Sequence, residues 1–164
     1  MLAAIPAPIL QRTRRNVAYD IISKLYFTNG IPELIQMSYS KDKEVQFYAV
    51  NLLWLRAHYF YKPSDECIAA FCSALKTENL ETRLWAVKGL EILPLRHEAL
   101  PALHLALNDP EEEIRVIAAS VIVKLQPDFD LTHIFQAGMT SPNPNVRVIS
   151  NVELSRLKRL QSAR

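Results

Sequence analysis

Apolar residues between Ile114 and Leu125 recur at intervals of three and four positions. This spacing places them on one face of an α-helix. Matching patterns are offset from Arg115 by 32 residues in each direction, at Arg83 and at Arg147. The composition of Ile114 to Leu125 also suits a buried strand, but its repeat partners have helical patterns. We therefore predict a chain built from repeated helical units.

Equivalent positions form columns down the repeats. An arginine or glutamine is followed three residues later by a small residue, and seven and ten residues later mostly by apolar residues. The columns are Arg15, Gln46, Arg83, Arg115 and Arg147; then Ala18, Ala49, Ala86, Ala118 and Ser150; then Ile22, Leu53, Leu90, Ile122 and Leu154; and then Leu25, Arg56, Leu93, Leu125 and Leu157. Spacings of three, four and three residues match one helix face, and the first copy is the weakest.

A second helical segment precedes each of the last four copies, and proline marks its start twice at the same offset, at Pro32 and Pro101. Proline is tolerated there because the first turn of a helix leaves its N–H groups unpaired. In the turn between the helices, Asp109 is predicted to be an N-cap, with Glu112 completing a capping box. The first helices share an apolar column of Leu34, Phe71, Leu103 and Phe135.

One helix pair cannot bury its apolar face alone, so stacked pairs share a continuous core. We predict an all-α protein, an α-solenoid of about four to five helical hairpins, that forms a single domain over residues 1–164. Its units are 31–62, 63–94, 95–126 and 127–160, and residues 1–30 form an irregular or partial first unit. Ser150, Asn151 and Glu153 predict a more polar final helix at the end of the stack.

These residues give the chain a resemblance to a known family. Leu100-Pro101-Ala102-Leu103 matches a proline-marked first helix, Asp109-Pro110 matches the turn, and Ile114-Arg115 with Ala118 matches the start of the second helix. In these features the chain is similar to the HEAT-like repeat proteins, including the short bacterial type of the phycobilisome lyases. The resemblance covers about residues 31–160 and implies that the second helices line a concave face. It is specific for fold and not for function, because such repeats serve many tasks.

The arginine column has two interpretations. The resemblance implies that its members pair with turn aspartates, so that Arg83, Asp109, Arg115 and Arg147 would form an inter-repeat ladder. This ladder is incomplete, because Gln46 replaces the arginine in the first full unit. Alternatively, a regular row of guanidinium groups follows a nucleic-acid backbone. We favour the ladder, because the net charge is only +2 and nucleic-acid footprints are usually more basic.

Composition restricts the function further. The chain has 164 residues, of which 49% are hydrophobic and 22% charged, as in an ordinary globular domain. No apolar stretch approaches the ~20 residues that a membrane-spanning helix needs. Cys67 and Cys72 point to different sides of one helix and are expected to stay unpaired. We therefore expect a cytoplasmic protein.

Enzyme chemistry has little support in the sequence. It contains no Gly-rich phosphate loop, no serine elbow and no Cys-x-x-Cys motif. His97-Glu98 is the sole His-Glu pair, whereas a HEAT-like di-iron hydroxylase of the deoxyhypusine type uses several. His58, His104 and His133 do not repeat in register with carboxylates. We predict no catalytic residues, no metal site and no cofactor.

The longest junction between units carries a group of aromatic residues. The first full unit is five residues longer than the next two, and the extra length falls near Trp54 to Pro63, where five of ten positions are aromatic if His58 is counted. Insertions in solenoids lie at an edge, often near the binding face, and tryptophan and tyrosine dominate interface energetics. This aromatic edge either extends the core or forms an interaction patch.

We predict a non-catalytic adaptor or scaffold that binds another protein through the concave face of the solenoid. The partner-binding residues are expected to be exposed positions of the second helices together with the aromatic edge: Tyr48, Asn51, Lys88, Glu91, His58, Tyr59 and Tyr61. Two alternatives stay open, a bilin lyase-like chromophore-handling subunit and nucleic-acid binding through an arginine-lined face. The sequence identifies neither the partner nor the oligomeric state.

Overall fold

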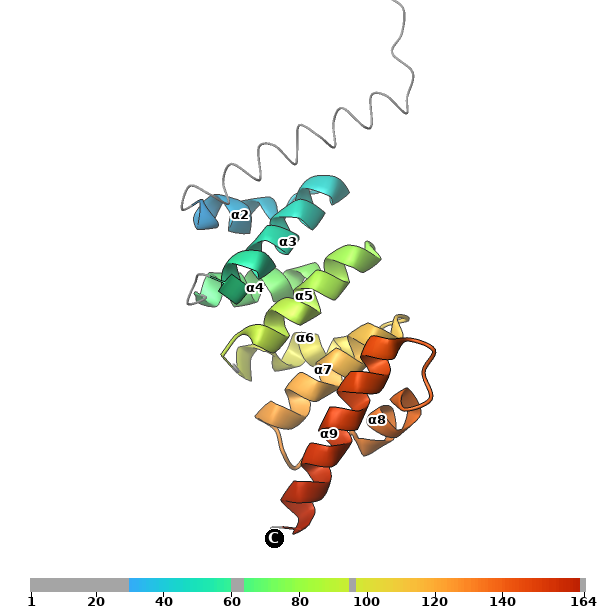
Figure 1. Ribbon diagram of the computed structural model, residues 1–164. Helices are drawn as coiled ribbons and strands as arrows, with labels where there is room; N and C mark the ends of the chain where they lie inside the picture. The colour runs from blue at the N-terminus through green and yellow to red at the C-terminus, as the bar shows by residue number, and fades with distance from the viewer. Residues whose placement is uncertain (1–29, 60–63, 95–96, 163–164) are drawn as a thin grey trace, which may run out of the picture.

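The computed structural model describes residues 30–59, 64–94 and 97–162, and these form an all-α solenoid (Figure 1). The described helices are α2 Ile31–Met37, α3 Lys43–Tyr59, α4 Asp65–Ala74, α5 Leu80–Ile92, the 3₁₀ helix η1 His97–Ala99, α6 Leu100–Ala106, α7 Glu112–Leu125, α8 Thr132–Gly138 and α9 Pro144–Ser162. They stack as the pairs α2/α3, α4/α5, α6/α7 and α8/α9. The predicted fold class is confirmed.

The helix pairs lie where the sequence repeat places them. Each pair falls within one predicted unit, except that α9 continues past the expected boundary at residue 160. The predicted first unit, apart from Gly30, lies outside the described residues. The segment for which a strand was the competing interpretation is helix α7. Its predominantly apolar composition has a physical reason, because α5, α6, α8 and α9 all pack against it.

The prolines and the turn residues determine where helices begin. Pro32 and Pro101 occupy the first turns of α2 and α6, as predicted. The N-cap prediction for Asp109 is wrong: its Oδ1 accepts the N–H of Glu111 at 2.9 Å, and the helix begins at Glu112. Glu112 is therefore not part of a capping box, and its carboxylate accepts the Ser141 hydroxyl instead. The longer turn leaves the Asp109 carboxylate beside the preceding repeat.

The core lies between a layer of first helices and a layer of second helices. The apolar column of the first helices is fully buried there, at Leu34, Phe71, Leu103 and Phe135. Second helices contact their neighbours along the stack more extensively than first helices do. Tighter contact on one side curves a stack toward that side, so the second helices are expected to line its concave face.

Candidate functional site

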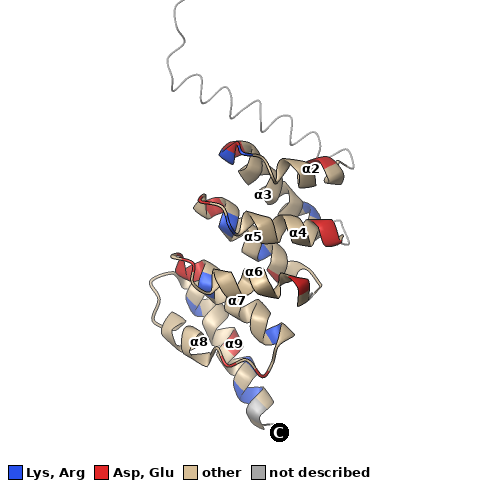
Figure 2. Ribbon diagram, turned by 180° about the vertical axis from the view of Figure 1, so that it is seen from behind, with Lys and Arg blue, Asp and Glu red and all other residues tan. Residues whose placement is uncertain are grey.

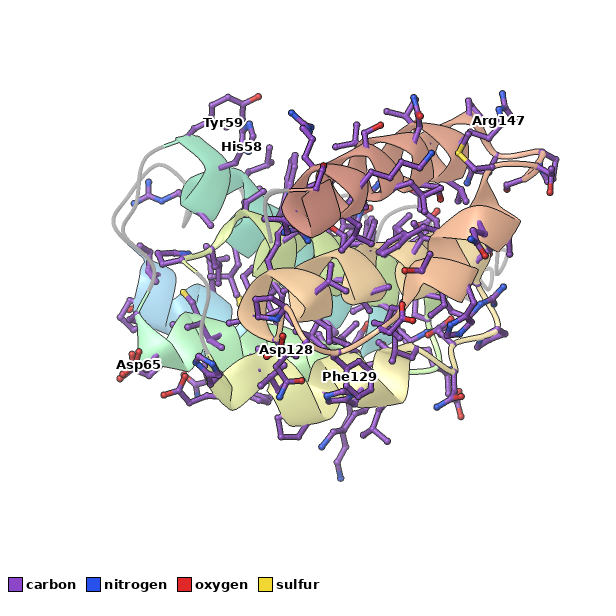
Figure 3. All side chains as sticks on the ribbon, turned by 90° about the horizontal axis from the view of Figure 1, so that it is seen from below. His58, Tyr59, Asp65, Asp128, Phe129 and Arg147 are labelled. Carbon is purple, nitrogen blue, oxygen red and sulfur yellow. The ribbon has the colours of Figure 1, made fainter. Side chains whose placement is uncertain are left out.

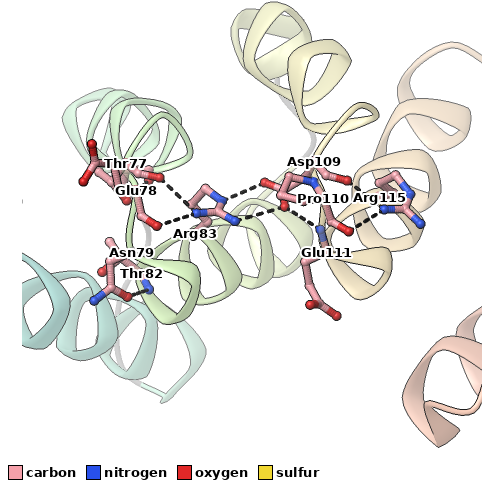
Figure 4. A network of polar contacts seen from close by, with 10 residues as sticks. Thr77, Glu78, Asn79, Thr82, Arg83, Asp109, Pro110, Glu111 and Arg115 are labelled. Carbon is pink, nitrogen blue, oxygen red and sulfur yellow. Dashed lines mark hydrogen bonds and ion pairs between the residues drawn. The ribbon is translucent and has the colours of Figure 1, made fainter.

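Acidic and basic residues gather at the turns that precede α3, α5 and α7 (Figure 2). Arg83 joins two of these turns (Figure 4). Its Nη1 donates to the carbonyl oxygens of Thr77 and Glu78 in its own repeat, at 3.1 and 2.9 Å. Its Nε and Nη2 donate to the Asp109 carboxylate of the next repeat, at 2.7 and 3.2 Å. Because the two side chains are only 12% and 7% exposed, this bidentate pair is shielded from solvent.

Arg115 and Arg147 do not extend this pair into the predicted ladder. Arg115 Nη1 donates to the carbonyl oxygens of Asp109 and Pro110, at 2.7 and 2.9 Å. Arg147 Nη1 donates to those of Ser141 and Pro142, at 2.6 and 2.9 Å. Both arginines thus hold the turn of their own repeat, because the turn after Arg115 offers an uncharged serine and α9 is the last described helix.

The second helices line a groove of about 330 Å³. Its lining residues are Trp54 from α3; Lys88, Glu91 and Ile92 from α5; Glu113 and Ile117 from α7; and Asn145, Val148 and Ile149 from α9. Side chains of α3 and α9 reach one groove because the row of second helices curves inward. In Figure 3, Tyr59 and Arg147 lie on this side of the molecule. Asp65 and Phe129 lie on the opposite side, with the first helices.

Aliphatic side chains stand open along the groove. Ile92 is 36% exposed and Val148 is 64% exposed, and Val152, one turn beyond Val148 on α9, is 55% exposed. Trp54 is half-buried and packs on Trp85, with 4.7 Å between the ring centroids. Contiguous open apolar side chains of this kind mark interaction surfaces in soluble proteins.

Basic and acidic side chains of α5, α7 and α9 lie in or beside the groove. Lys88 Nζ is 3.0 Å from Glu113 Oε1. Glu153 forms ion pairs with two basic side chains. Lys124 Nζ lies 3.4 Å from its Oε1, and Arg156 Nε lies 2.6 Å from its Oε2. The whole group has three residues of each sign: Lys88, Lys124, Arg156, Glu91, Glu113 and Glu153. Since Glu153 holds two cations, Glu91 is left without a hydrogen bond or ion pair to any described residue.

The two glutamates of the groove respond oppositely to their surroundings. Burial raises the pKa of Glu91, Lys124 and Lys88 offset only part of this rise, and Glu153 adds to it. Burial also acts to raise the pKa of Glu113, but hydrogen bonds from Lys88 and from two asparagines near the start of α9 outweigh it, so the pKa is lowered. A bonded partner accounts for the difference, and Glu91 has none.

We expect Glu91→Gln to stabilise the fold at neutral pH. Because the pKa of Glu91 is higher in the folded than in the unfolded chain, the folded state binds the proton more tightly, and stability is lost as the pH rises and the carboxyl ionises. The variant should raise the Tm by about 1–3 °C at neutral pH. The gain should vanish below about pH 4, where the carboxyl is protonated in both states.

Thermal melts followed by circular dichroism across this pH range test the expectation. Glu113→Gln is the matched control on the neighbouring helix. It should lower the Tm at neutral pH, because the depressed pKa of Glu113 contributes stability that is lost only as the pH falls. Changes of the same sign in the two variants would contradict the assignment of Glu91 as an unpaired carboxylate.

The sequence profile of HEAT repeats matches residues 31–123, which is more than half of the chain. The chain belongs to the HEAT-repeat family. The predicted HEAT-like resemblance is confirmed, whereas the narrower phycobilisome-lyase type stays a prediction. No curated protein matches the chain.

Among the solved structures that resemble this HEAT-repeat chain, two are crystal structures of engineered proteins from the Northeast Structural Genomics Consortium. The first is 22% identical with a TM-score of 0.57, and the match covers 88% of this chain and 70% of that one. The second is 22% identical with a TM-score of 0.55, and the match covers 88% of this chain and 42% of that one. At this identity the likeness shows the HEAT fold alone, and the chain spans less than half of the second protein.

The HEAT groove brings together part of the partner-binding set that the sequence predicts. Lys88 and Glu91 line it, although both are half-buried rather than exposed as expected. Tyr48 lines a separate pocket of about 340 Å³ near the starts of α3 and α5, and Asn51 is half-buried on α3. The difference arises because neighbouring second helices of a HEAT stack cover positions that are open on an isolated helix.

The aromatic edge lies at the end of α3. His58 stacks on Trp54 with 5.3 Å between ring centroids, and Tyr59 meets His58 edge-on at 4.5 Å. Trp54 packs against the core, whereas His58 and Tyr59 are exposed, so the cluster extends from core to surface. Both sequence interpretations therefore describe part of it. Tyr61 lies outside the described residues.

Sequence reasoning missed the contribution of α9 to the groove. The repeat register marks Val148 as a core position, because its equivalents pack into the core: Val116 is buried and Leu84 is half-buried. No described helix follows α9, so Val148 stays open. The final helix is the most polar of the second helices, as predicted, but its polar residues are divided: Asn151 is exposed, whereas Ser150 and Glu153 are buried. An aliphatic residue at a core position of the final unit is the signal that was available.

Metal binding, membrane insertion and thiol catalysis have little basis in the described residues. Among them, no three His, Cys, Asp or Glu side chains gather closely enough to hold a metal ion. None of the described helices is long and apolar enough to cross a membrane. Cys67 and Cys72 are free, and burial raises the pKa of both thiols. Thiols with a raised pKa are poor nucleophiles at neutral pH.

Proposed function

We propose that this HEAT-repeat protein is a non-catalytic adaptor that binds a segment of another protein in the groove of its second helices. HEAT repeats generally mediate protein interactions, which supports this class of function. The observation that carries the proposal is that three different helices contribute apolar side chains to one groove: the half-buried Trp54 and the exposed Ile92 and Val148.

The apolar area and the rigidity of the groove both favour binding. Covering aliphatic and aromatic surface contributes about 25 cal/mol for each Å² removed from water. Trp54 stands at one end of this surface and Val148 at the other, and both are fixed by packed helices. A preformed surface loses little conformational entropy on binding, so more of the contact energy appears as affinity.

We expect Val148→Asp to weaken partner binding by at least about tenfold without unfolding the chain, because Val148 is 64% exposed. Leu105→Asp is the matched control, since Leu105 is equally exposed but lies on α6, among the first helices. Quantitative affinity purification from the native cell, with circular dichroism as a check of folding, measures both. Partners retained by Val148→Asp, or lost equally by Leu105→Asp, would contradict the groove as the binding surface.

Nucleic-acid binding, the alternative suggested by the arginine column, has less support. The guanidinium groups of Arg83, Arg115 and Arg147 donate to turn carbonyls, and Arg83 also pairs with Asp109. These bonds support a structural role for the column. No observation favours a bilin lyase-like subunit. Two free cysteines, one of them buried, support a reducing, cytoplasmic location.

A further inference from the structure

Glu91 is a groove residue whose carboxylate has no hydrogen-bond or ion-pair partner among the described residues. Its side chain is half-buried on α5 and lines the groove beside Ile92. The nearest cations already serve other carboxylates, with Lys88 bonded to Glu113 and Lys124 to Glu153. A carboxylate that has lost part of its hydration without gaining a partner is held at a cost in free energy.

The surroundings of Glu91 limit what could satisfy it. Trp54, Ile92 and Val148 make the rest of the groove largely apolar. An occupant that carries a positive charge between apolar side chains complements both features at once. An acidic occupant would be repelled, because the basic groups beside the groove are already paired.

We propose that the groove recognises a protein segment in which a lysine or arginine is flanked by apolar residues. The basic side chain pairs with the Glu91 carboxylate, while its apolar neighbours contact Ile92 and Val148. This inference rests on the proposed adaptor function and specifies the chemistry of the partner at the same groove.

The energetics favour this pairing over a new surface ion pair. Part of the desolvation of Glu91 has already taken place in the unbound protein, so the partner's cation removes less water from this carboxylate than from a fully exposed one. The same feature predicts opposite effects of one substitution. Glu91→Gln stabilises the free chain, as argued above, and weakens the complex, so weaker binding by this variant cannot result from unfolding.

Selection from a library of random peptides displayed on phage, with the full chain as bait, tests the proposal. Peptides that bind the chain but not Val148→Asp are retained as groove-dependent. They are expected to share a lysine or arginine between apolar residues. Their affinity, measured by calorimetry, should fall at least about tenfold for Glu91→Gln. Glu33→Gln, which removes an exposed carboxylate from α2, should leave it unchanged.

A double-mutant cycle makes the test specific. Replacing the basic residue of a selected peptide by norleucine should lower its affinity for the chain and abolish the difference between the chain and Glu91→Gln. Groove-dependent peptides that lack a basic residue, or that bind Glu91→Gln equally well, would overturn this inference and leave the adaptor function standing. A selection that yields no peptide sensitive to Val148→Asp would overturn both.

Discussion

Asp109→Ala is expected to lower the free energy of unfolding by about 3 kcal/mol and the Tm by about 6–12 °C. The Asp109 carboxylate accepts two hydrogen bonds from Arg83 across the interface between two repeats. Because both side chains are nearly buried, removal of the carboxylate leaves a shielded guanidinium without its counter-charge. Urea denaturation of the purified chain measures the loss.

Asp42→Ala is the matched control for this prediction. Asp42 occupies the turn before α3, and its Oδ1 accepts the N–H groups of Glu44 and Val45, so it holds its turn much as Asp109 does. It is exposed and makes no ion pair with an arginine among the described residues. Its replacement should cost about 1 kcal/mol, the usual value of a helix cap.

The excess loss in Asp109→Ala then measures the ion pair itself. In a double-mutant cycle with Arg83→Gln, the two effects should couple by at least about 1 kcal/mol. Glutamine suits this purpose because Gln46 Nε2 already donates to a turn carbonyl, that of Ser38, at 3.0 Å. Equal losses in Asp42→Ala and Asp109→Ala would show that Asp109 acts only as a turn residue.

The arginine column shows how far the sequence could predict this network. The repeat pattern identified Arg83, Arg115 and Arg147 as equivalent, and all three do bond to the turn carbonyls five and six residues before them. The sequence also places an aspartate in the turn after Arg83 and a serine in the turn after Arg115, but it could not predict the geometry that brings the Asp109 carboxylate to Arg83. That contact depends on the turn at Asp109. This turn is longer than it would be if Asp109 were the N-cap, because the helix begins only at Glu112.

The groove shows a second limit to what the sequence can predict. Helical periodicity identifies which face of one helix is apolar, and it placed Lys88 and Glu91 on the side of the second helices that lines the groove. It does not report how adjacent helices cover one another. The pairing of Lys88 with Glu113, and the absence of such a partner for Glu91, depend on the offset between α5 and α7, which no pattern along the sequence contains.

Gly89→Val is expected to lower the free energy of unfolding by about 2–3 kcal/mol. Gly89 lies on α5 at a close approach of two helices, and its neighbour there is Phe71 of α4. A Cβ atom at residue 89 would lie 2.6 Å from Cε1 and 2.7 Å from Cζ of the Phe71 ring. The ring is fully buried, so it has little room to move away. Urea denaturation measures the loss.

The next repeat supplies a rescue for this clash. It carries Leu103 and Val121 at the positions of Phe71 and Gly89, and both are buried without a glycine. Phe71→Leu combined with Gly89→Val reproduces that pair, and the double variant should be more stable than Gly89→Val alone by at least about 1 kcal/mol. Strictly additive losses would mean that the two side chains do not compete for one space. Rescue would show that large and small residues are exchanged between the two layers of the solenoid while their combined volume is kept.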